Sequence, residues 1–266
     1  MFCRVSRNLT GLRGILTGAS SGVGRALARA LATRGARLLV TGRREQRLTD
    51  LVAEFPGQLS MAAGDLTQAV FRQQLVAQAT ATYGGLDLVL AAAGSGAVGP
   101  FAESTPVTLR EIFEIDFFAP VELVRLALPA LREGRTPAAV FVGSILGEHA
   151  LPLHAEYCAA KAALHGFVQA VRPELRAEGI GLLLAMLGPT ESEFWDNLLA
   201  GERASWSQGQ PLSAEATAAA ILRALEQGRS VVQPGWRARS FTTLARLWPG
   251  LLDRAITRKV REPHRS

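Results

Sequence analysis

The sequence has little cysteine and no long apolar run. Its two cysteines, Cys3 and Cys158, are too few for a disulfide framework or for zinc-site spacing, so we expect a reducing compartment and no bound metal. No stretch reaches the roughly 18 uncharged residues that cross a bilayer, and residues 1–14 lack the apolar core of a signal peptide. These absences predict a cytoplasmic protein.

Lysine and aromatic residues are also scarce. The net charge is +6, yet only two of the 29 basic residues are lysines, and no block of roughly five or six basic residues occurs. Scattered arginines do not make the basic patch typical of nucleic-acid-binding proteins, so we expect no nucleic-acid partner. Aromatic residues make up 6% of the chain, and the core must therefore rest on leucine, valine, isoleucine and alanine.

What the chain does contain is a regular alternation of short apolar runs and helical stretches, which predicts βαβ units around a parallel sheet. The expected strands cover residues 12–17, 37–41, 58–63, 86–93, 138–143, 180–186 and 230–233. The expected helices cover residues 22–34, 45–54, 67–83, 108–132, 154–178 and 214–227. No repeat or linker interrupts them, so we predict one doubly wound α/β domain over residues 1–235 and a less regular basic, amphipathic tail over residues 236–266.

The first expected strand runs directly into a glycine-rich turn, TGASSGVG at residues 17–24, which opens a helix. Glycines allow a tight turn and let backbone N–H groups approach a pyrophosphate at the positive end of the helix dipole. A purely structural turn is the alternative, but the strand–turn–helix context favours dinucleotide binding. The expected cofactor contacts here are Gly18, Ser20, Ser21, Gly22, Val23 and Gly24.

The end of the second expected strand indicates which dinucleotide is bound. Arg43 stands where the chain faces the adenosine ribose, and residues 41–44 contain no aspartate or glutamate. An acidic residue there would bind the 2′-hydroxyl, whereas arginine accommodates a 2′-phosphate, so NADP(H) is favoured over NAD(H). The alternative is an ordinary solvated arginine. Asp65, after the third strand, is expected to accept from the adenine amino group or to cap the next helix.

Three residues around the fifth strand indicate catalytic chemistry. Ser144 ends that strand at the edge where such sheets bind ligands, and the spacing of Tyr157 and Lys161 places both on one face of the next helix. A free tyrosine titrates near pH ~10, but a neighbouring ammonium favours the phenolate. We therefore expect Tyr157 to act as acid/base while Ser144 holds the substrate oxygen. An ordinary surface pair is the alternative for Tyr157 and Lys161 taken alone.

These motifs resemble the compact, single-domain short-chain dehydrogenases/reductases over residues 9–235. The matching segments are TGASSGVG at 17–24, the arginine after the second strand, GDLT at 64–67, Ser144, Tyr157 with Lys161, and LGPTESEF at 187–194. The resemblance implies a Rossmann-type sheet of order 3-2-1-4-5-6-7 with helices on both faces, carbonyl–alcohol interconversion, and a homodimer or homotetramer. It also implies cofactor contacts from Leu66, Ala93, Gly94, Tyr157, Lys161, Pro189, Thr190 and Ser192.

The chain departs from the pattern of that family at several positions: Leu187 replaces a usual proline and Ser192 a usual threonine, which are mild changes, and two further departures bear on the sheet and the proton relay. Residues 91–94 read Ala-Ala-Ala-Gly where the family usually has Asn-Asn-Ala-Gly, which removes side-chain hydrogen bonds from the central sheet. Asp116 stands where the family normally has an asparagine that holds a water of the proton relay. Asp116 is expected to bind such a water, to pair directly with Lys161 and reduce its pull on Tyr157, or to be merely a buried carboxylate. Our hypothesis is that Asp116 takes part in catalysis, which survives in altered form.

The end of the chain bears on substrate and partners. Residues 190–211, with Phe194, Trp195 and Trp206, lie where the family places a mobile lid and predict an apolar carbonyl or alcohol, with ordinary packing as the alternative. The tail suits packing against protein, which we favour, or peripheral contact with an anionic membrane.

The function predicted from the whole sequence is that of an NADP(H)-dependent oxidoreductase. The rival prediction is a non-catalytic NADP(H)-binding sensor or scaffold.

Overall fold

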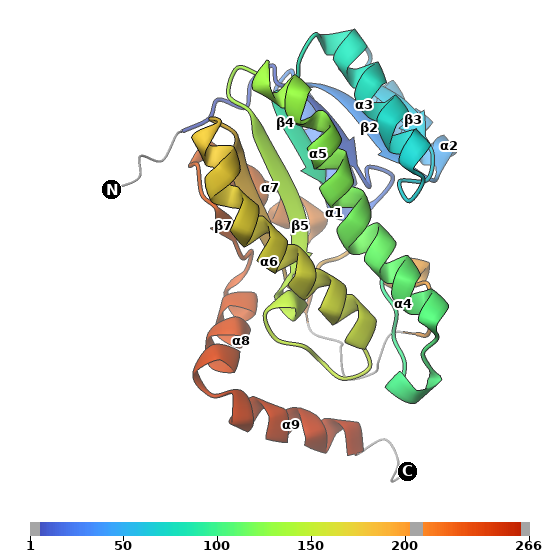
Figure 1. The fold of residues 1–266 in the computed structure, drawn as a ribbon, viewed down its shortest axis with the longest axis vertical. Helices are drawn as coiled ribbons and strands as arrows, with labels where there is room; N and C mark the ends of the chain where they lie inside the picture. Colours follow the sequence, from blue (N-terminus) through green and yellow to red (C-terminus); the bar gives the residue numbers. More distant parts are fainter. Residues whose placement is uncertain (1–5, 203–209, 262–266) are drawn as a thin grey trace.

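The strands of this computed structural model form one parallel sheet, and the structure describes residues 6–202 and 210–261. In these ranges the order is β3-β2-β1-β4-β5-β6-β7, as predicted (Figure 1). The bounds are β1 Arg13–Thr17, β2 Arg37–Gly42, β3 Leu59–Ala63, β4 Leu88–Ala91, β5 Ala138–Ser144, β6 Gly181–Leu187 and β7 Val231–Val232. Cys3, Trp206 with the rest of the lid segment 203–209, and residues 262–266 of the tail lie outside the described residues.

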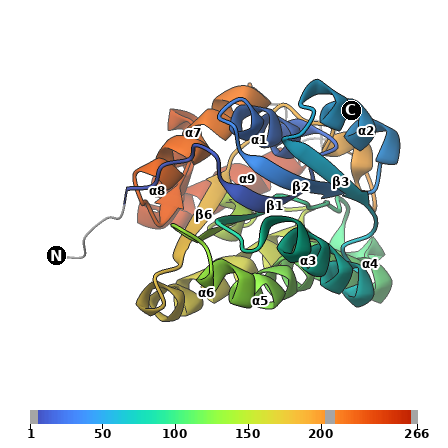
Figure 2. The same cartoon turned by 90° about the horizontal axis from the view of Figure 1, so that it is seen from above.

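Helices connect the strands and cover both faces of the sheet (Figure 2). They are α1 (Gly22–Ala32), α2 (Glu45–Glu54), α3 (Ala69–Tyr83), α4 (Pro106–Phe113), α5 (Ala119–Arg132), α6 (Ala155–Ala177), α7 (Ala214–Glu226), α8 (Trp236–Leu247) and α9 (Pro249–Arg261). A π-helical turn, η2 (Glu114–Phe118), joins α4 to α5, and short 3₁₀ turns are η1 (Phe101–Glu103), η3 (Ile145–Gly147) and η4 (Trp195–Asn197).

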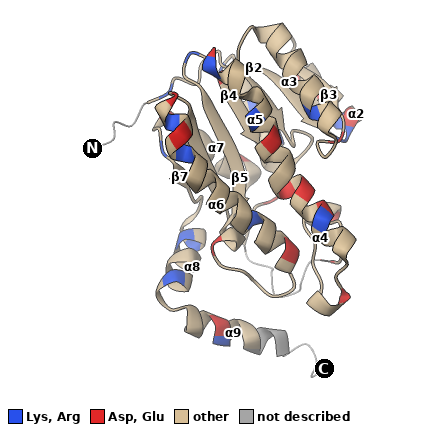
Figure 3. Cartoon of the chain, in the orientation of Figure 1, with Lys and Arg blue, Asp and Glu red and all other residues tan. Residues whose placement is uncertain are grey.

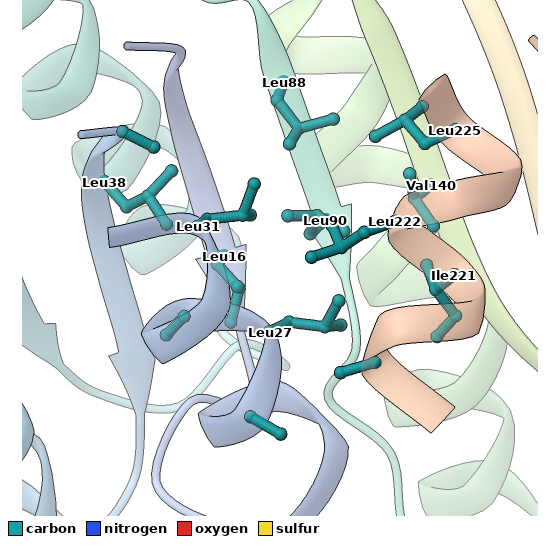
Figure 4. Packing of buried hydrophobic residues seen from close by; sticks show 14 of the residues in the cluster. Leu16, Leu27, Leu31, Leu38, Leu88, Leu90, Val140, Ile221, Leu222 and Leu225 are labelled. Carbon is teal, nitrogen blue, oxygen red and sulfur yellow. The ribbon is translucent and has the colours of Figure 1, made fainter. Parts of the chain in front are cut away.

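The core has two layers because successive strand residues point to opposite faces. Ile15 of β1 packs with α3, α5 and α6, whereas its neighbour Leu16 packs with α1, α2 and α7. Figure 4 shows the second layer, where Leu27 of α1 and Ile221 of α7 lie over the central strands. Both faces of the strands are therefore buried, which explains their continuous apolar runs, and each fully buried leucine contributes about 2 kcal/mol to folding.

The helix predicted over residues 108–132 differs from the observed one. It begins at Pro106 and widens into the π-helical turn η2 before α5 continues to Arg132. Pro120 has no amide hydrogen to donate to the carbonyl of Asp116, so one α-helical hydrogen bond is missing at this point. The side chain of Asp116 is completely buried in this turn.

The expectation of a less regular tail is wrong, because α8 and α9 occupy most of it. Both lie at the end of the molecule where α6 begins (Figure 1). α8 buries Ala238 and Ala245, the ring of Phe241 lies 5.9 Å from that of His149, and Asp253 of α9 lies 3.7 Å from His149 Nε2. The tail therefore packs against the loop between β5 and α6. Among the described residues, no helix has the length and apolar character required to cross a bilayer.

Candidate active site

Ser144, Tyr157 and Lys161 meet at the carboxyl end of β5. Ser144 is the last residue of β5 and the N-cap of η3, and its Oγ accepts a hydrogen bond from the backbone N–H of Leu146. α6 begins at Ala155 and carries Tyr157 and Lys161 one turn apart, with Lys161 Nζ 5.6 Å from the centre of the tyrosine ring. The spacing read from the sequence thus corresponds to a spatial cluster.

Asp116 reaches the same cluster from η2. Its Oδ1 lies 2.9 Å from Lys161 Nζ, and Nζ also donates to the carbonyl of Val142 at 3.1 Å. Of the three arrangements expected for Asp116, the structure has the direct pair with Lys161. Gly94 leaves the room for it, because a Cβ at that position would stand 2.6 Å from Oδ1.

Burial and charge set the protonation of this cluster. Burial raises the pKa of Asp116, against the opposing pull of the Lys161 ammonium. Burial alone would lower the pKa of Lys161, but Asp116 and Tyr157 outweigh it and the net pKa is raised. Burial also raises the pKa of Tyr157; Lys161 lowers it, while the Asp116 carboxylate raises it further. Tyr157 is therefore held as the neutral phenol, ready to donate a proton.

The glycine turn has the shape of a phosphate cradle. Gly18 and Gly22 have φ of +72° and +49°, and a Cβ on Gly24 would stand 2.2 Å from the carbonyl oxygen of Gly18. Within the described residues no side chain caps α1 and its first turn carries no acidic residue, so its amino end is open to an anion. The turn therefore fits the pyrophosphate of a dinucleotide.

Thr17 steadies this turn, although the sequence reasoning passed over it. Its buried Oγ1 accepts hydrogen bonds from the backbone N–H groups of Ala92 and Ala93, each at 3.0 Å. One threonine thereby ties the end of β1 to the segment after β4, where the family's asparagines are missing. The signal was present in the strand-ending threonine, but its partners lie 75 and 76 residues away.

Arg44, rather than Arg43, turns toward the glycine turn. Arg44 Nη2 donates to the hydroxyls of Ser20 and Ser21 at 3.1 and 2.6 Å, and Nη1 lies 2.5 Å from the carboxylate of Glu193. Arg47, one turn further along α2, binds the same carboxylate. Arg43 is exposed, and a cofactor contact from it stays a prediction. The sequence reasoning did not single out Arg47 or Glu193.

The other predicted cofactor residues line the carboxyl edge of the sheet. Asp65 is exposed and its carboxylate accepts from the backbone of Thr67, a local turn rather than a cap on α3, whose first residue is Ala69. Leu66 is buried, and Ala93 and Gly94 follow β4.

The predicted cofactor residues after β6 make local hydrogen bonds. The carbonyl of Pro189 accepts from the backbone of Leu212, Thr190 Oγ1 donates to the carbonyl of Gly188, and Ser192 Oγ accepts from the backbone of Phe194. Val23 is half-buried in the first turn of α1.

Aromatic side chains from the lid segment cover Tyr157. The ring of Phe194 lies 5.5 Å from that of Tyr157, and Trp195 lies 6.2 Å from His154. His154 Nδ1 is 2.8 Å from the carbonyl of Pro152, and burial lowers the pKa of this histidine. On the side of the lid segment, the tyrosine is thus bordered by aromatic rings.

Comparison with known proteins agrees with this fold. The short chain dehydrogenase family matches residues 14–203. A short chain dehydrogenase of Pseudocercospora fijiensis is 33% identical over 196 residues, 71% of this chain and 62% of that protein, so the match spans less than two thirds of that relative. Hydroxysteroid 11-beta-dehydrogenase 1-like protein A of Xenopus laevis is 29% identical over 94% of this chain and 87% of its own.

Solved structures give the same result. A short chain dehydrogenase from Burkholderia cenocepacia in complex with NADP superimposes with a TM-score of 0.79 at 25% identity, over 94% of this chain and 99% of that one. The protein belongs to the short-chain dehydrogenase/reductase family and has its oxidoreductase fold. The family resemblance read from the sequence is confirmed.

Proposed function

We propose that the protein is an NADP(H)-dependent oxidoreductase that interconverts a carbonyl and an alcohol on an apolar substrate. The observation that carries the proposal is the cluster of Ser144, Tyr157 and Lys161 beside the glycine turn. In this cluster a proton donor, a hydroxyl and an ammonium surround one point at the sheet edge where doubly wound folds bind ligands.

Each residue has a distinct part in the proposed reaction. The bound nicotinamide supplies or accepts the hydride. Ser144 holds the substrate oxygen, and Tyr157 gives that oxygen a proton during reduction and takes it back during oxidation. Lys161 stabilises the phenolate that Tyr157 becomes when it releases its proton, and it holds the nicotinamide ribose. Asp116 pairs with Lys161 and partly offsets its charge, so proton release from Tyr157 is less favoured than beside a free lysine.

The preference for NADP(H) is supported by the residues around Ser20. Arg44 donates to both serines of the glycine turn, and Arg47 binds the same carboxylate as Arg44, so two guanidinium groups stand where a 2′-phosphate is the expected anion. The Burkholderia cenocepacia relative was solved with NADP.

An apolar substrate is supported by the lid. Phe194 and Trp195 stand over Tyr157 and His154 and offer no charged group to a sugar or an acid. The Xenopus laevis relative is named a hydroxysteroid 11-beta-dehydrogenase 1-like protein. A flat, apolar ketone or alcohol is the class of molecule that such a wall accepts.

A homodimer or homotetramer is also proposed. α4 and η2 expose Val107 (62%), Leu109 (42%) and Phe118 (47%), and the turn η1 exposes Phe101 (83%). Such a group of exposed apolar side chains on adjacent turns suits a contact between copies of the chain.

The test compares oxidation of NADPH and NADH with a panel of apolar ketones. We expect NADPH consumption by the wild type and a loss of about 10²- to 10⁴-fold in Tyr157→Phe. Tyr83→Phe is the matched control, since Tyr83 is the other tyrosine of the chain and its hydroxyl lies 3.2 Å from Ser60 at the opposite part of the sheet. Wild-type activity in Tyr157→Phe would refute the assignment.

The rival function is a non-catalytic NADP(H) sensor or scaffold. It is favoured by one observation, the direct pairing of Lys161 with Asp116, which withdraws part of the charge that activates Tyr157. A wild-type protein that binds NADPH tightly and consumes none with any ketone would support it.

A further inference from the structure

A carboxylate from the lid occupies the arginines next to the glycine turn. Glu193 Oε2 lies 2.5 Å from Arg44 Nη1, and both carboxylate oxygens contact Arg47 Nη1. Arg47 and Arg44 together lower the pKa of Glu193, which is therefore ionised. Arg44 also donates to Ser20 and Ser21, so this carboxylate is attached to the side chains that border the proposed phosphate site.

The same short segment reaches the catalytic tyrosine. Ser192, before Glu193, lies against the glycine turn, where a Cβ on Gly22 would stand 2.8 Å from Ser192 Cβ. Phe194, after Glu193, packs its ring against Tyr157. Three consecutive residues thus connect the arginines, the glycine turn and the tyrosine. A shift of the backbone at Glu193 also shifts Ser192 and Phe194, because they are its covalent neighbours.

The ion pairs of Glu193 with Arg44 and Arg47 are weak enough for a stronger anion to replace the carboxylate. The side chains of Arg44, Glu193 and Arg47 are 33%, 39% and 43% exposed, and ion pairs this open to water contribute little. A phosphate carries more charge than a carboxylate and offers three acceptor oxygens to the guanidinium groups. A ribose hydroxyl has no charge and does not replace a carboxylate between two arginines.

We propose that Glu193 is a specificity-determining residue, an internal anion that the 2′-phosphate of the cofactor must displace from Arg44 and Arg47. Displacement moves the segment 192–194 away from the glycine turn and uncovers Tyr157, so a dinucleotide without the 2′-phosphate leaves the lid attached. This inference rests on the proposed NADP(H) specificity and adds to it a coupling between the phosphate and access to the catalytic tyrosine.

The experiment uses adenosine 2′,5′-bisphosphate and adenosine 5′-monophosphate as probes, which differ only in the 2′-phosphate. Their affinities are measured by calorimetry for the wild type, Glu193→Gln and the control Glu191→Gln. Glu191 is exposed and lies two residues before Glu193, so its variant removes the same charge from the same segment. We expect Glu193→Gln to bind the bisphosphate about fivefold tighter, because its competitor is gone, with the monophosphate and the control unchanged.

Hydrogen exchange of the backbone in residues 192–199 gives a second readout that does not depend on activity. The bisphosphate is expected to speed exchange in the wild type while the monophosphate does not, and Glu193→Gln is expected to exchange fast without any ligand. Unchanged bisphosphate affinity in Glu193→Gln, or unchanged exchange on bisphosphate binding, overturns the inference but leaves NADP(H) specificity standing. If the wild type and the variants bind the two probes with equal affinity, the proposed NADP(H) specificity is overturned as well.

Discussion

His165 makes the stability of the protein depend on pH in a range that can be calculated. It lies one turn beyond Lys161 on α6 and is only 3% exposed, tightly enclosed by Gly143 and Gly147. Within the described residues, neither ring nitrogen has a hydrogen-bond partner. Burial, together with the charge of Lys161, lowers the pKa of His165 to about 4. The native protein therefore holds a neutral imidazole near the ammonium of Lys161.

The sign and size of the effect follow from the two pKa values. In the unfolded chain the imidazole titrates at about 6.5, so between pH 6.5 and 4 the unfolded state binds a proton that the folded state rejects. The contribution is fully present above pH ~6.5 and declines on acidification until the folded protein also protonates near pH ~4. The complete difference corresponds to about 3.4 kcal/mol, of which about 2 kcal/mol is lost between pH 7.5 and pH 5.

The assay is urea unfolding of the wild type and His165→Gln at several pH values from 7.5 to 5. Glutamine does not titrate, and every other group, including the buried His154, is common to both proteins and cancels. The free energy of unfolding of the wild type relative to the variant is expected to fall by about 2 kcal/mol over this range. A difference that stays constant with pH would refute the reasoning, because it would mean that His165 protonates equally in both states.

Two further predictions concern Asp116 and the tail. In Asp116→Asn the carboxylate that raises the pKa of Tyr157 is gone, so the pH dependence of alcohol oxidation is expected to move to lower pH; an unchanged profile denies Asp116 any catalytic part. We also propose that α8 touches anionic membranes, since Trp236 (66% exposed) and Leu247 (58%) remain uncovered on a helix that carries arginines (Figure 3). A variant with both residues changed to alanine should co-sediment less with phosphatidylserine vesicles than the wild type, and equal sedimentation dismisses the contact.

The sheet was predictable because its strands are buried on both faces and carry nearly continuous apolar runs. The bounds of α2 agree with the prediction, and those of the six longer strands agree within two residues at each end. The π-helical turn was not predictable in the same way. Pro120 predicts that one helical hydrogen bond is missing, but it does not determine whether the helix ends, bends or widens at that point. The packing that buries Asp116 decides this, and packing is not a property of the local sequence.

In the candidate site, too, the local features were predictable from the sequence and the long-range contacts were not. Tyr157 and Lys161 are four residues apart on one helix, so their proximity follows from helical geometry alone. The glycine turn is likewise a local motif. Arg44 and Glu193 are 149 residues apart in the chain, and the local sequence around either residue does not predict their contact. The direct pairing of Asp116 with Lys161 was one of three expected arrangements, and only the fold selects it.

Both cationic parts of the site are balanced by carboxylates of this chain, and burial separates their roles. Asp116 is completely buried against Lys161, so removing either charge would leave the other isolated in a medium of low polarity, and the pair is permanent. Glu193 sits in water-exposed pairs, where another anion can take its place at little cost. A permanent partner adjusts the proton affinity of Tyr157, whereas an exchangeable one responds to which cofactor arrives. The roles of the two carboxylates therefore depend on their burial: exchanging the buried and the water-exposed environment would exchange the roles of Asp116 and Glu193, whereas exchanging aspartate and glutamate would not.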